Sequence, residues 1–155
     1  MRVTRMISGT ALALLWPMAM AFAGGPPAPV GFKALEGKCV RVVAGDEDLT
    51  AGCNSKLGII SYADGRTGFY FLLSDNRILT FSGFGKARDR NTYGLDRVVY
   101  NDGTGAAMPR VVPASGSCAY GNPYKGPVTV RCKGRTPQGE IFAATFRSNG
   151  KPPKQ

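Results

Sequence analysis

Four cysteines are the residues of this chain with the clearest capacity for chemistry. Cys39 and Cys53 lie 14 positions apart, and Cys118 and Cys132 repeat that separation. Four cysteines allow three disulfide connectivities, and the repeated spacing favours Cys39–Cys53 with Cys118–Cys132. A zinc site usually takes its ligands in pairs only a few residues apart, and no CxxC redox motif occurs. We therefore predict two structural disulfides.

Histidine is absent from the sequence. Its absence removes the usual general base, the Ser-His-Asp and Cys-His arrangements, and the commonest transition-metal ligand. The acidic run Asp46-Glu47-Asp48 lacks the spread of oxygen donors found in a calcium loop, so we interpret it as a solvated turn, with a weak surface calcium site as the alternative. We predict no catalytic residue, no metal and no cofactor, and hence no enzyme. A histidine-independent hydrolase is the less favoured alternative.

Residues 1–23 have the pattern of a secretory signal peptide. Arg2 and Arg5 form a basic start, an apolar run covers residues 7–20, and Ala21-Phe22-Ala23 supplies small residues for cleavage after Ala23. This apolar run is too short to span a bilayer, so we expect no transmembrane segment after cleavage. The predicted location is the periplasm or the outside of the cell, where an oxidising environment favours disulfides.

The remaining chain predicts one all-β domain over residues 35–148, a small antiparallel barrel or sandwich with two disulfide-pinned halves. Short β-branched and aromatic segments alternate with turn signals. No Gly- and Pro-free window of useful length carries a helical period. Residues 24–34 are expected to be a flexible Pro/Gly lead-in, and residues 149–155 a disordered basic tail.

One hairpin is predicted with particular clarity. Strand-like residues 57–62 and 67–74 flank the turn signal Asp64-Gly65. On the second strand Phe69, Phe71 and Leu73 share one face, and Tyr70 lies on the other. Both faces are largely apolar, which is typical of a strand inside a barrel or sandwich.

Between Leu35 and about Phe146, the chain contains the stretches GKCVRVVAGDEDLTAGC, SYADGRTGFYF, ILTFSG, DRVVYN and GSCAYGNPYKG. In this combination the chain resembles a group of small exported four-cysteine bacterial proteins of unknown function. The resemblance rests on turn and strand motifs. It implies the same fold and the same cysteine pairing, and it implies no activity.

Charge is the main functional signal. Removing the leader, with Arg2 and Arg5, leaves 18 basic against 10 acidic side chains, a formal charge of +8. Such a surplus attracts anionic partners. A second basic group is formed by Arg131, Lys133 and Arg135, and the tail adds Lys151 and Lys154.

The densest basic segment, residues 83–94, is expected to be a long glycine-flanked loop on a rigid scaffold, a frequent location for binding function. We predict that one working surface combines its cations and a tyrosine with the arginine that follows: Lys86, Arg88, Arg90, Tyr93 and Arg97. The alternative is a solvated connection whose cations serve solubility.

These features together predict an exported bacterial binding module. Its partner would be an anionic envelope component or a partner protein, which includes the case of an enzyme inhibitor. Basic residues interleaved with aromatic ones also suit nucleic acid, but an exported protein rarely meets it, so we expect no nucleic-acid partner. A structural envelope protein without a specific ligand is the alternative.

Overall fold

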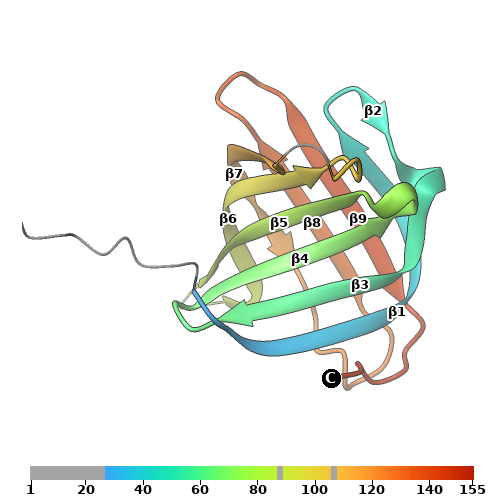
Figure 1. Ribbon diagram of the computed structural model, residues 1–155. Helices are drawn as coiled ribbons and strands as arrows, with labels where there is room; N and C mark the ends of the chain where they lie inside the picture. Colours follow the sequence, from blue (N-terminus) through green and yellow to red (C-terminus); the bar gives the residue numbers. More distant parts are fainter. Residues whose placement is uncertain (1–26, 87–88, 106–107) are drawn as a thin grey trace, which may run out of the picture.

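A computed structural model describes residues 27–86, 89–105 and 108–155, which form an antiparallel β-barrel (Figure 1). In this part of the chain eight strands close in the order β1-β3-β4-β5-β6-β7-β8-β9, because β1 also pairs with β9, and the short β2 lies beside β1. The elements are β1 (Pro29–Ala44), β2 (Glu47–Asp48), η1 (Thr50–Gly52), β3 (Cys53–Tyr62), β4 (Arg66–Leu73), η2 (Ser74–Asn76), β5 (Ile78–Lys86), β6 (Asp89–Asn101), β7 (Arg110–Ala119), β8 (Thr129–Arg135) and β9 (Ile141–Ser148). The all-β prediction is confirmed, as a barrel. The predicted signal peptide lies outside the described residues, none of which forms a helix long and apolar enough to cross a membrane.

Alternate residues of each strand face the barrel interior and fill it. Five phenylalanine side chains are fully buried there: Phe69, Phe71, Phe81, Phe142 and Phe146. An eight-stranded barrel has an interior just wide enough for such side chains. The predicted hairpin forms as β3 and β4. Because the interior is a packed core, binding surfaces belong to the outer wall and the ends of the barrel.

β1 is shared between two neighbours. Residues 29–36 pair with β3, and residues 37–44 pair with β9. The change of partner occurs at Gly37, where a Cβ would lie only 2.1 Å from the carbonyl oxygen of Arg147. The prediction that residues 24–34 form a flexible lead-in is wrong for Pro29–Ala34, which hydrogen-bond to β3 as part of the barrel wall.

The tail prediction is also wrong, because residues 149–155 are fastened to β1. The backbone of Lys154 exchanges two hydrogen bonds with Ala34, of 2.8 and 3.0 Å, and its Nζ lies 2.6 Å from the Glu36 carboxylate. Pro153 is buried. Residues 29–36 pair with β3 on one side only, and the tail covers part of the edge that β9 leaves free.

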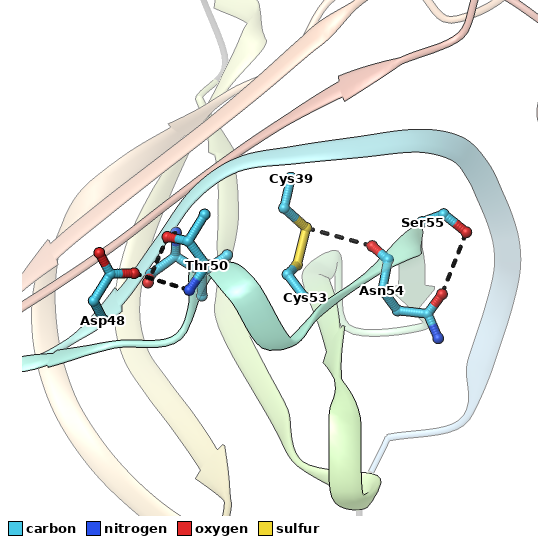
Figure 2. Close-up of a disulfide and its surroundings, with 7 residues drawn as sticks. Cys39, Asp48, Thr50, Cys53, Asn54 and Ser55 are labelled. Atoms are coloured by element: carbon cyan, nitrogen blue, oxygen red, sulfur yellow. Dashed lines mark hydrogen bonds between the residues drawn. A yellow bond between two sulfur atoms is a disulfide. The ribbon is translucent and has the colours of Figure 1, made fainter.

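Both predicted disulfides are confirmed, and they differ in their relation to the strand pairing. Cys118 and Cys132 are directly paired residues of β7 and β8. Cys39–Cys53 instead links β1 to the start of β3, beyond Glu36 and Lys56, the last pair of their ladder (Figure 2). The first disulfide therefore closes a gap where backbone pairing has stopped.

The segment 83–94, predicted as a loop, belongs to two paired strands. Phe84 pairs with Gly94 and Gly85 with Tyr93, so β5 and β6 continue almost to the tip of their hairpin. A Cβ on Gly83 would lie 1.8 Å from the Gly94 carbonyl oxygen. The loop prediction is wrong because these glycines permit a close approach of two strands.

We predict that Gly83→Ala destabilises the barrel by at least about 2 kcal/mol, because its new methyl group requires β5 and β6 to separate. Gly85→Ala is the matched control on the same strand, since the nearest neighbour of its Cβ is Tyr93 Cε1 at 3.5 Å. This control should change the unfolding free energy by no more than about 0.5 kcal/mol. Urea unfolding of the two variants measures the difference, and equal values would contradict the close-approach argument.

Loss of either disulfide should cost about 3 kcal/mol, since each closes a loop of similar length. The two losses should differ in local protection from hydrogen exchange. Without Cys39–Cys53, amides at the start of β3 should exchange faster, because no ladder to β1 holds them there. Without Cys118–Cys132, the β7–β8 ladder remains and should keep its protection. Equal local effects in paired Cys→Ala variants would argue against the gap-closing role.

Candidate functional site

Of the five predicted site residues, the structure separates Tyr93 from Arg97. Lys86 and Arg90 belong to the paired ends of β5 and β6, and Arg88 lies outside the described residues. The Tyr93 ring packs against the core, with its centroid 5.3 Å from that of Phe69. Arg97 is exposed on the outer wall and its Nε lies 3.2 Å from an Asp96 carboxylate oxygen. Tyr93 and Arg97 therefore share no surface.

A β-bulge at Asp96 explains this separation. Side chains four positions apart lie on one face of a regular strand. Here Gly83 pairs with Leu95 and Ser82 pairs with Arg97, so Asp96 is an extra residue in β6. The extra residue reverses the alternation of faces, and the side chains before and after it change sides.

The largest collection of outward cations lies on three other neighbouring strands, β8, β9 and the second half of β1, at the back of the barrel in Figure 1. All six of these side chains are exposed, because the positions between them face the core. We call this surface the basic wall; its members are Lys38, Arg41, Arg131, Lys133, Arg135 and Arg147.

The strand register brings the basic wall together from distant parts of the sequence. Lys38 pairs with Arg147, while Arg41 and Arg131 flank Thr145 in one row across the three strands. Residues 37–44, β9 and β8 contain no aspartate or glutamate. In the described part of the chain, no cation of the wall belongs to an ion pair. Arg135 donates a hydrogen bond to the carbonyl oxygen of Gly139, at 3.3 Å, and all six side chains are exposed to solvent.

Carboxylates gather elsewhere, at the end of the barrel where β1, β4, β6 and β8 finish. Turns and short elements at this end hold six of the chain's ten: Asp46, Glu47, Asp48, Asp75, Asp102 and Glu140. Two of them pair with local arginines, Arg77–Glu47 at 3.1 Å and Arg110–Glu140 at 2.8 Å. The wall approaches this acidic end through Arg41 and Arg135: hydrogen bonds from Thr50, then the charge of Arg41, lower the pKa of Asp48.

A cleft of about 650 Å³ borders the basic wall where β1 changes partner. It is lined by Glu36, Gly37, Lys38, Ser55, Lys56, Arg147, Ser148 and Asn149. The hydrogen bond and charge of Lys154 lower the pKa of Glu36, so this carboxylate is already engaged by the tail. Lys38, Lys56 and Arg147 extend the cationic surface into the cleft.

A groove of about 400 Å³ lies on the opposite side, on the outer face of β4, β5 and β6. Its lining comprises Pro27, Tyr62, Asp64, Arg66, Tyr70, Thr80, Ser82, Arg97 and Val99. Arg97 is the only member that the sequence analysis placed in a site. The others were missed because they come from the segment before β1, the β3–β4 turn and the four strands β3 to β6, and only the barrel brings them together.

A bidentate ion pair organises one side of this groove. Both terminal nitrogens of Arg66 donate to Asp96 at 2.7 Å, and Arg66 Nη1 also donates to Ser82 Oγ at 3.1 Å. The Arg66 guanidinium lies over the Phe84 ring, 4.4 Å from its centroid. The hydrogen bonds of Arg66, then those of Arg97, lower the pKa of Asp96 to about 2. Arg66 is therefore held in one orientation by contacts on several sides.

Comparisons with protein-family models, with curated proteins and with solved structures find no significant match to this chain. The resemblance to exported four-cysteine proteins stays a prediction. The basic wall, its cleft and the groove are therefore interpreted from their own geometry.

The Asp96 ion pair predicts a specific acid response. Since the folded pKa of Asp96 is about 2 and its ordinary value is 3.8, the pair contributes stability above about pH 4 and loses it as the pH falls toward 2. The carboxylate is 41% exposed, so screening limits this contribution to about 1 kcal/mol. Asp96→Asn should be less stable at neutral pH and should match the wild type below about pH 2. Urea unfolding of both proteins across this pH range measures the difference in their unfolding free energies. If that difference did not change with pH, the stability contribution assigned to the Asp96 carboxylate would be wrong.

Proposed function

We propose that this protein is an exported binding module that holds a multivalent anionic component of the cell envelope on its basic wall. The observation that carries the proposal is the placement of six exposed cations on β8, β9 and residues 37–44 of β1, none of which contains a carboxylate. Export is supported by the two disulfides and by the leader-like sequence of residues 1–23.

The shape of the wall favours an extended partner. Outward side chains on a closed barrel diverge from a convex surface, whereas a small ligand needs polar groups that converge in a concave site. Neighbouring strands are about 4.8 Å apart and alternate residues about 6.8 Å apart, so the cations form an array. A surface or polymer with repeated phosphate or carboxylate groups can contact several of them at once.

Charge reversal on the wall tests the proposal. The mature protein should bind vesicles containing phosphatidylglycerol, or the acidic glycan heparin, at low ionic strength. The double variant Lys133→Glu/Arg147→Glu should weaken that binding at least about tenfold, since each basic residue near an anionic surface contributes about 1 kcal/mol. Vesicle co-sedimentation and heparin titration measure the change and distinguish a lipid surface from a soluble acidic polymer.

The matched control is Lys86→Glu/Arg90→Glu, which changes the net charge equally at the β5–β6 hairpin. Screening confines each charge to about 10 Å, so we expect this control to weaken binding by no more than about twofold. If both double variants lost binding affinity equally, the binding would be explained by net charge and not by the basic wall. Failure to bind either probe would overturn the proposal.

A further inference from the structure

The groove on β4–β6 requires a different explanation from the basic wall. Arg66 and Arg97 line it and are balanced by Asp64, also in its lining, and by the neighbouring Asp96, with ion-pair distances between 2.7 and 3.9 Å. A site whose charges cancel does not select an ion of either sign. Its remaining features are aromatic rings and neutral hydrogen-bonding groups.

Glycines on the outer face allow the Tyr70 ring to lie along the sheet. A Cβ on Gly68 would lie 2.7 Å from Tyr70 Cε2 and 3.1 Å from Cζ, so the ring covers that position. Gly58 likewise leaves space between Tyr70 and Phe32. A ring supported against the backbone on one face offers its other face to a ligand.

Hydroxyl groups border this ring. The Tyr62 and Tyr70 hydroxyls share a short hydrogen bond, which uses one of their two protons and leaves the other as a donor. Burial, then the bond to Tyr62, raises the pKa of Tyr70. Thr80 and Ser82 also line the groove, and each of these residues is only 6% exposed. The groove thus combines donors and acceptors with an aromatic face.

We propose that this groove binds a neutral saccharide. A pyranose ring has an apolar C–H face, which packs on an aromatic ring, and a rim of hydroxyls that both donate and accept hydrogen bonds. Arg66 and Asp96 are planar groups already fixed by each other, and the carboxylate of Asp64, which lines the groove, can accept from sugar hydroxyls. The volume of about 400 Å³ suits one or two sugar units.

Tyrosine fluorescence offers a direct readout. The only tryptophan, Trp16, lies in the predicted signal peptide, so tyrosines dominate the emission of the mature protein. Titration with chitotetraose, cellotetraose and maltotetraose should change this emission with at least one of the three, at an affinity insensitive to salt. Tyr70→Leu should weaken binding at least about tenfold, and Tyr70→Phe, which keeps the ring, should retain most of it.

Tyr124→Leu is the matched control, because Tyr124 is 52% exposed on the β7–β8 connection, away from the groove. It should leave saccharide affinity unchanged, as should Lys133→Glu/Arg147→Glu, so failure here and failure of the proposed anion binding are distinguishable. No binding of the three sugars, or equal losses in Tyr70→Leu and Tyr124→Leu, would overturn the inference. Circular dichroism of each variant checks that the barrel has formed.

Discussion

The constraint on which the rest of this structure depends is closure of the sheet through β1. An open sheet would leave two edges of unpaired backbone groups, and β1 removes them by pairing with β3 and then with β9. The required bend falls at Gly37, where no larger residue fits against Arg147. Closure creates two local defects. The β1–β3 ladder stops early, and Cys39–Cys53 spans the gap; one side of residues 29–36 is left open, and the C-terminal tail covers part of it.

Closure also assembles the basic wall, because it places residues near position 40 beside residues 131–147. Like charges directly opposite each other destabilise a sheet. Lys38 and Arg147 form such a pair, whereas Thr145 separates Arg41 from Arg131 without neutralising them. The packed core and two disulfides can offset that repulsion. Arg77 and Arg110 show that this chain pairs arginines with carboxylates elsewhere, at the acidic end of the barrel. The proposed anionic partner would account for cations on the wall that belong to no ion pair among the described residues.

Sequence reasoning reached the fold class and both disulfides because they depend on local signals: alternation, turn residues and cysteine spacing. Its predictions were wrong where a local backbone feature, either a close contact of two strands or a β-bulge, altered the structure that a residue pattern usually indicates. Gly83 and Gly94 have the composition of a loop but mark a close contact of strands. Tyr93 and Arg97 have the spacing of one face, yet the bulge at Asp96 divides them. The group Arg131, Lys133 and Arg135 was recognised, but its neighbours Lys38 and Arg147 could be identified only from the strand order.

The two proposed surfaces lie on opposite sides of a barrel whose interior is filled by phenylalanine side chains. Coupling between sites requires an element with two arrangements that both ligands bias. A closed ladder around a close-packed core, fastened by two disulfides, offers no such element among the described residues. Occupation of the groove should therefore leave the wall unchanged, and their affinities should be independent. Given both proposals, the geometry suits a rigid link between a neutral glycan and an anionic surface, with salt weakening one attachment and sparing the other.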